Sequence, residues 1–200
     1  MMNSALYWYI RRQFPDVNQI KTSDLDDAQK ITDHGETENA SPVPDNETKR
    51  AYVIVDCRRE DEFDVSHIPK ANHLPFQTDD ESIIRFIKEE KDKQSHLNAS
   101  ADELNLVCYC SLGYRSSLLA QRITNIVKND PELSSKGVNA WNLEGSIFKW
   151  ANEKRPLVDM YERSTKFAHP FNLTFGMFLQ SEYRKWEPDK PDKQEDLQNK

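Results

Sequence analysis

A short apolar run that ends in a cysteine and leads directly into a helical pattern constrains the fold of this chain more than any other feature. The run, Leu104 to Tyr109, is typical of a buried strand. The apolar residues beyond it recur at the spacing of one helix face: Leu118, Leu119, Ile123, Ile126 and Val127. Cys110 therefore lies in a tight loop between a predicted strand and a predicted helix.

The start of that helix is a favourable place for an anion. Free backbone N–H groups converge there, and the helix dipole presents its positive end. A cysteine thiolate is an anion, so the pKa of a cysteine at such a position falls from about 8.5 toward roughly 3.5–7.5. Arg115, at the end of the same loop, adds a fixed positive charge. The pattern predicts a reactive thiolate that faces a small anionic substrate.

The composition excludes two broad classes of function. A net charge of -7 argues against a nucleic-acid partner, which requires a basic face. No apolar run approaches the roughly 18–20 residues that cross a bilayer, so we expect no membrane partner. Three cysteines without framework spacing are typical of a reducing compartment. We expect a cytoplasmic protein, and a mitochondrial presequence is the alternative for the N-terminus.

Predicted strands and helices alternate along the chain. We expect strands near residues 17–20, 51–55, 72–74, 104–109 and 138–143, and further helices near 22–31, 60–65, 82–90 and 145–154. This alternation predicts an α/β fold with a central parallel sheet of about five strands and helices on both faces. Ligands of such sheets bind beyond the carboxyl ends of the strands, which is where Cys110 lies.

Polar stretches and apolar ends divide the chain further. We expect a domain over residues 17–158 that carries a polar insertion at 33–50, an N-terminal aromatic helix or extension at 1–16, and a charged, disordered tail at 187–200. Residues 159–186 are too apolar for a free tail. We expect this C-terminal extension to pack on the domain; the alternative is a dimer or partner surface.

Four short motifs, in order along the chain, carry a family resemblance. They are Val55-Asp56-Cys57-Arg58 followed by Glu60 and Phe63, His67-Ile68-Pro69 followed by Ala71 and Asn72, the loop from Cys110 to Arg115, and Asn142-Leu143-Glu144-Gly145 with Trp150. In these motifs the chain resembles single-domain members of the rhodanese-like (sulfurtransferase) family. The resemblance runs from about residue 17 to residue 158 and implies the rhodanese-like α/β fold.

The resemblance also implies a two-step transfer of sulfane sulfur. The Cys110 thiolate attacks the outer sulfur of a small anionic donor such as thiosulfate, and the persulfide then passes that sulfur to cyanide or a cellular thiol, a protein thiol included. No metal or organic cofactor is required. Two alternatives stay open. One is a non-catalytic binding or regulatory module. The other is a phosphatase or arsenate reductase, whose loop in related proteins is one residue longer.

The loop pattern and the resemblance together assign the site residues. Cys110 is the expected nucleophile. The expected persulfide cradle consists of the residues that follow it: Ser111, Leu112, Gly113, Tyr114, Arg115 and Ser116. The family places Asp56 and Arg58 as supporting braces around this face. We expect Cys57 and Cys108 to be packing residues, although an exposed thiol at either position could resolve a persulfide as a disulfide. No metal site is expected.

Overall fold

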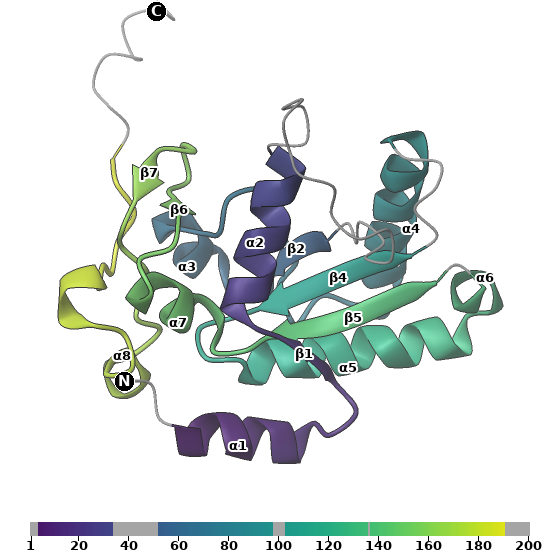
Figure 1. The fold of residues 1–200 in the computed structure, drawn as a ribbon, viewed down its shortest axis with the longest axis horizontal. Coiled ribbons are helices and arrows are strands. Elements are labelled where there is room, and N and C mark those ends of the chain that lie inside the picture. Colours follow the sequence, from purple (N-terminus) through teal and green to yellow (C-terminus); the bar gives the residue numbers. More distant parts are fainter. Residues whose placement is uncertain (1–3, 34–51, 98–102, 136, 191–200) are drawn as a thin grey trace, which may run out of the picture.

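Five parallel strands form the central sheet of the protein (Figure 1). The computed structural model describes residues 4–33, 52–97, 103–135 and 137–190. The strands are β1 (Asn18–Ile20), β2 (Tyr52–Asp56), β3 (Asn72–His73), β4 (Leu104–Tyr109) and β5 (Val138–Leu143), in the spatial order β1-β5-β4-β2-β3. Every neighbouring pair is parallel. The predicted α/β fold with about five parallel strands is confirmed.

Helices fill the connections between these strands and also lie before the first strand and after the last, where a short 3-10 helix spans Ser181–Tyr183. They are α1 (Ser4–Gln13), α2 (Thr22–Asp33), α3 (Glu60–Val65), α4 (Asp80–Leu97), α5 (Tyr114–Asn129), α6 (Pro131–Ser134), α7 (Ser146–Asn152) and α8 (Leu173–Gly176). An antiparallel pair, β6 (Leu157–Val158) and β7 (Ser164–Thr165), lies between α7 and α8. The predicted insertion at 33–50 lies outside the described residues beyond Asp33, and so does the predicted tail beyond residue 190.

The side chains of β4 show how the sheet is covered on both faces. Leu104, Leu106 and Cys108 contribute to one buried cluster, together with apolar side chains of α1, α4 and α5. Val107 and Tyr109 point into a second cluster, which contains side chains of α2 and α7. All six residues of β4 are buried, as expected for the middle strand of a sheet with helices on both faces. In Figure 1, α2 and α5 flank the strands from opposite sides.

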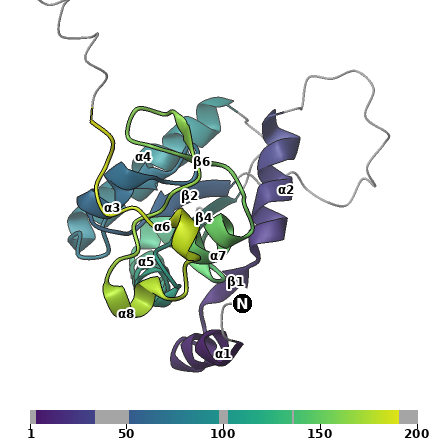
Figure 2. The same ribbon diagram turned by 90° about the vertical axis from the view of Figure 1, so that its left-hand side faces the viewer.

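The carboxyl ends of the strands meet at one edge of the sheet. In Figure 1 they point to the left, where α7 and α8 lie, and α1 runs below the same region. Figure 2 looks onto this end of the molecule and again places α1, α7 and α8 there. Cys110 directly follows β4 at this edge. No helix in the described ranges is long and apolar enough to cross a bilayer.

Candidate active site

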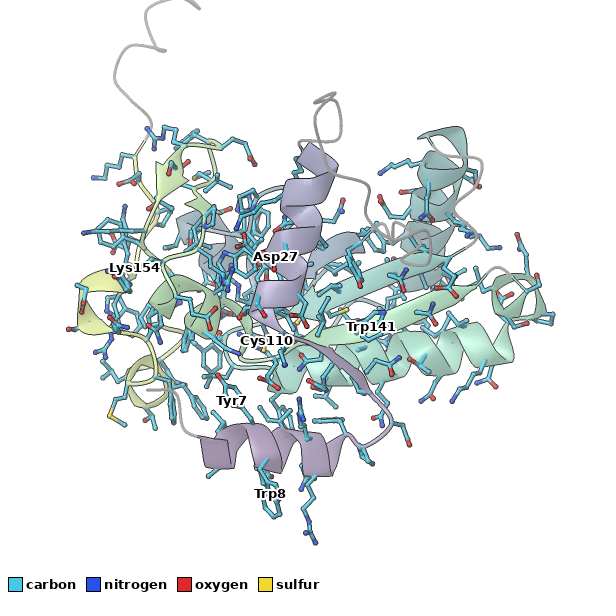
Figure 3. All side chains as sticks on the ribbon, in the orientation of Figure 1. Tyr7, Trp8, Asp27, Cys110, Trp141 and Lys154 are labelled. Carbon is cyan, nitrogen blue, oxygen red and sulfur yellow. The ribbon has the colours of Figure 1, made fainter. Side chains whose placement is uncertain are left out.

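Cys110 lies in a closed turn between β4 and α5 (Figure 3). Gly113 adopts φ +114°, a left-handed conformation that favours glycine, and its N–H donates to Cys110 Sγ over 3.1 Å. The backbone N–H of Cys110 donates to Ser146 Oγ over 3.1 Å, which ties the loop to α7. Only 2% of Cys110 is exposed. The loop therefore closes around the cysteine sulfur itself.

Several groups favour the thiolate form of Cys110 over the thiol. Burial alone would raise its pKa. That effect is outweighed by a hydrogen bond from the Cys57 thiol, the positive charge of Arg115 and a hydrogen bond from the backbone N–H of Ser116. Together these contacts hold the pKa of Cys110 well below its usual range. The direction agrees with what the sequence pattern predicts for a cysteine at this position.

The other two cysteines are buried, but they differ in their relation to Cys110. The N–H of Cys57 donates to the carbonyl of Tyr109 over 3.0 Å, which places Cys57 beside the end of β4. Burial and the hydrogen bond to Cys110 hold the pKa of Cys57 well above its usual range, so it stays a protonated donor. Burial, followed by the charge of Cys110, raises the pKa of Cys108 to about 12. Cys57 is buried in the core, as a packing residue is, and its thiol also contacts Cys110.

Glu62 is a site residue that the sequence reasoning missed. The motif comparison emphasised Glu60, but Glu60 is exposed, whereas Glu62 on α3 is fully buried against the loop. Both terminal guanidinium nitrogens of Arg115 donate to the Glu62 carboxylate over 2.7 and 2.8 Å, and Ser111 Oγ donates to it over 3.0 Å. Burial would raise the pKa of Glu62, but the hydrogen bond and charge of Arg115 and the charge of Arg58 lower it to about 2.

Because of this pairing, the positive charge of Arg115 is balanced by a carboxylate. The sequence predicts a fixed positive charge at Arg115, and the structure shows that the buried carboxylate of Glu62 pairs with its guanidinium group. Burial would lower the pKa of Arg115, yet the Glu62 hydrogen bond and the charges of Cys110 and Glu62 raise it. The arginine therefore has two partners, since it neutralises Glu62 and also favours the Cys110 thiolate.

The remaining loop residues have different environments. Ser111 Oγ faces Glu62 and also accepts a hydrogen bond from Arg115 over 2.8 Å, while Ser116 Oγ donates to Asn142 Oδ1 over 2.6 Å. Leu112 is buried, whereas Tyr114 is 46% exposed. The exposed rim of the loop is therefore aromatic.

A comparison of the sequence with models of known protein families tests the resemblance that the four motifs indicate. The sequence matches the Rhodanese-like domain family over residues 39–153, which is more than half of the chain. The chain belongs to the rhodanese-like domain family. No curated protein matches it.

Solved structures with a similar fold differ in the activities that their names give. The BH2092 protein from Bacillus halodurans is 17% identical with a TM-score of 0.49, covering 86% of this chain and 95% of that one. A yeast protein tyrosine phosphatase of the Rhodanese family is 19% identical with a TM-score of 0.47, covering 68% of this chain and 85% of that one. A thiosulfate sulfurtransferase from Pseudomonas aeruginosa is 14% identical with a TM-score of 0.45, covering 86% of this chain and 26% of that one. At such identities the likeness does not extend to activity.

Asp56 and Arg58 form a buried ion pair next to the loop of this rhodanese-like domain. Both side chains are fully buried, and Arg58 donates to the two carboxylate oxygens of Asp56 over 2.6 to 3.1 Å. A further donation from Arg58 to the carbonyl of Ser66 over 2.6 Å joins the end of β2 to the residue after α3. The charges of Asp56 and Arg58 thus neutralise each other at the end of β2.

Segments on both sides of the sequence that matches the family contact the loop. Ile10 and Phe14, at and just beyond the end of α1, belong to the same buried cluster as Cys110, and the ring of Phe14 packs against Tyr114 with 5.3 Å between centroids. From the C-terminal segment, the ring centroid of Phe171 lies 4.5 Å from Arg115 Cζ. Neither segment belongs to the residues that match the family.

Proposed function

We propose that this protein is a sulfurtransferase that moves a sulfane sulfur through a persulfide on Cys110. The observation that carries the proposal is the thiolate of Cys110, held in a six-residue loop whose Gly113 N–H points at the sulfur over 3.1 Å. A nucleophile with a lowered pKa and no need for a general base suits attack on a divalent sulfur. Family membership supports sulfur donors and acceptors as the general substrate classes.

The proposed reaction has two steps. Cys110 thiolate attacks the outer sulfur of a donor such as thiosulfate, the donor S–S bond breaks, and sulfite leaves with the bonding electron pair. The terminal sulfur of the persulfide is then attacked by cyanide or a thiol, which restores the Cys110 thiolate. Neither step needs a metal or an organic cofactor. A protein thiol is a further acceptor, and the cytosol is the compartment we propose for the activity.

The size of the loop favours sulfur transfer over phosphate hydrolysis. Because the Gly113 N–H already lies against Cys110 Sγ, the loop has the dimensions of a cradle for one atom attached to that sulfur. A tetrahedral oxyanion needs several amides farther from the cysteine. The intact Cys110 and Arg115, with the lowered cysteine pKa, also favour an enzyme over a binding module that has lost its nucleophile.

Mass spectrometry of the intact protein tests the proposal. After incubation with thiosulfate or another sulfane donor, wild-type protein should gain the mass of one sulfur atom, which a reductant removes. Cys110→Ser should gain nothing. An adduct that persists in Cys110→Ser would move the site to Cys57 or Cys108. Hydrolysis of an aryl phosphate that depends on Cys110, with no persulfide formed from any donor, would favour the phosphatase alternative instead.

A further inference from the structure

The charges around Cys110 leave little attraction for a dianionic donor. Between Cys110 and Arg115 the loop has no charged side chain, so Arg115 is the sole cation that the loop supplies. The Glu62 carboxylate accepts a hydrogen bond from each terminal nitrogen of Arg115 and is ionised, with a pKa of about 2. Counting the thiolate, Glu62 and Arg115 together, the site has one net negative charge before a substrate enters.

The neighbouring cations do not reverse this balance. Arg58 is bound by the Asp56 carboxylate, and Arg59 donates to Asp61 through two nitrogens over 3.0 Å each. Burial lowers the pKa of His169, which lies near Glu62, so this imidazole is neutral near pH 7. The first turn of α3 is itself acidic. A donor with two negative charges therefore meets repulsion that a donor with one charge meets less strongly.

An aromatic ring covers the face of the arginine that its hydrogen bonds leave open. The Phe171 ring centroid lies 4.5 Å from Arg115 Cζ and 5.7 Å from Arg59 Cζ. Phe171 adopts φ +64°, a conformation that a phenylalanine rarely takes, and its N–H donates to His169 Nδ1 over 3.0 Å. The backbone is thus held in an unusual conformation that presents the ring to the arginine.

The chemistry next to the loop is therefore apolar and aromatic. Phe171 is half-buried, Phe175 lies beside it with 5.9 Å between ring centroids, and Phe175 and Tyr114 are 40% and 46% exposed. These rings can contact an organic group on a substrate, which inorganic thiosulfate does not have.

We propose, on the basis of the sulfur transfer proposed above, that the preferred donor carries its sulfane sulfur on an organic group and has a single negative charge, as a thiosulfonate does, and that Phe171 determines this preference. In the reaction the Cys110 thiolate forms a bond to the outer sulfur of the thiosulfonate. The S–S bond of the donor breaks, and the sulfinate leaves with the electron pair. No proton, oxidant or reductant enters the step.

Three donors separate the two parts of this proposal. Rate constants for persulfide formation on Cys110 are measured with thiosulfate, methanethiosulfonate and benzenethiosulfonate. Each rate constant is divided by the rate constant of the same donor with a free low-molecular-weight thiol, which removes differences between the leaving groups. The normalised rate should rise in that order and span at least about tenfold. High ionic strength should reduce the disadvantage of thiosulfate, because the repulsion is screened.

Variants of the full chain assign the preference to residues. Phe171→Ala should abolish most of the advantage of benzenethiosulfonate over methanethiosulfonate, while Phe171→Leu should keep part of it. Met177→Ala is the matched control, since Met177 lies in the same segment and is 69% exposed, and it should behave like wild type. Glu62→Gln should raise the thiosulfate rate relative to methanethiosulfonate by about fivefold or more, because it removes one negative charge. Near-UV circular dichroism establishes that each variant is folded.

The outcomes distinguish this inference from the proposed function. A persulfide that forms on Cys110 fastest from thiosulfate, with no effect of Phe171→Ala on donor preference, would overturn the inference and leave the sulfurtransferase proposal standing. No persulfide on Cys110 from any of the three donors would overturn both. The ionic-strength series and the Phe171 variants decide the case even if Glu62→Gln does not fold.

Discussion

At the scale of single residues, the Cys57 thiol donates a hydrogen bond to Cys110 and so helps to lower the pKa of Cys110. Cys57→Ala removes this donor and leaves the thiolate less stabilised, so the pKa of Cys110 should rise. Alkylation of Cys110 by iodoacetamide at acidic pH should then slow by about tenfold, the effect expected for one hydrogen bond to a charged group. Stopped alkylation followed by mass spectrometry measures the rate.

The conservative variant distinguishes this role from simple packing. Cys57→Ser keeps a donor at the same position and should react nearly as fast as wild type, whereas both variants remove similar volume from the core. Equal rates for wild type and Cys57→Ala across the acidic range would show that Cys57 does not stabilise the thiolate.

The residues of the site differ in how much of their role the sequence could reveal. Cys110 and Arg115 are recognisable because strand, loop and helix signals bracket them locally. The partnership of Arg115 with Glu62 joins residues far apart in the sequence, and α3 is too short for periodicity to show which of its carboxylates faces inward. The contact of Cys57 with Cys110 likewise depends on the pairing of β2 with β4, which no local pattern specifies.

At the scale of elements, Glu62 links α3 to the active-site loop, and this link should depend on pH. The pKa of Glu62 is about 2 in the folded protein against 4.5 ordinarily, so its stabilisation is complete above the unfolded value and is lost as the pH falls toward 2. The full contribution is roughly 3 kcal/mol. Urea unfolding measures the free energy of unfolding of wild type and of Glu62→Gln. The difference between the two should be smaller at about pH 3 than at about pH 6. A difference that does not change with pH would contradict this assignment.

Gly113 is the turn on which the loop depends. A Cβ at this position would lie 3.4 Å from the Asn142 amide and 3.5 Å from Ile10 Cδ1, so space is limited but available, whereas φ +114° is strained for any L side chain. Gly113→Ala should therefore cost about 1–2 kcal/mol of stability and rotate the N–H away from Cys110 Sγ. Thermal unfolding and the rate of persulfide formation measure the two effects, and a variant unaffected in both would mean that the turn tolerates other conformations.

The elements that the sequence predicted poorly are those set by side-chain caps or by distant packing. Helix α4 begins two residues earlier than periodicity indicated, where the Asp79 carboxylate accepts the Ser82 N–H over 2.8 Å. Helix α6 was not expected, and it is only one turn long, capped by Asp130. Helix α4 also runs to Leu97, seven residues beyond the predicted end at residue 90. The β-branched strand before Asp56 was predicted correctly, because burial on both faces of a sheet leaves an unbroken apolar run.

At the scale of the whole molecule, α1 packs beside the Cys110 loop, and this should couple α1 to the reactivity of Cys110. Ile10 is 3% exposed and belongs to the cluster that contains Cys110. Ile10→Ala should lower the free energy of unfolding by roughly 2–5 kcal/mol, still in a single transition, because α1 shares one core with the sheet.

The exposed side of the same helix provides the matched control for this last prediction. Trp8 is 62% exposed, and Arg12 Cζ lies 5.3 Å from its ring centroid, so Trp8→Ala should cost under about 1 kcal/mol. If α1 supports the loop, Ile10→Ala should also raise the alkylation rate of the buried Cys110 at neutral pH under native conditions. Trp8→Ala should leave this rate unchanged, because only the Ile10 substitution loosens the packing beside Gly113. An unfolding curve with a separate early transition for α1, at an unchanged alkylation rate, would instead mean that the helix docks on the loop without supporting it.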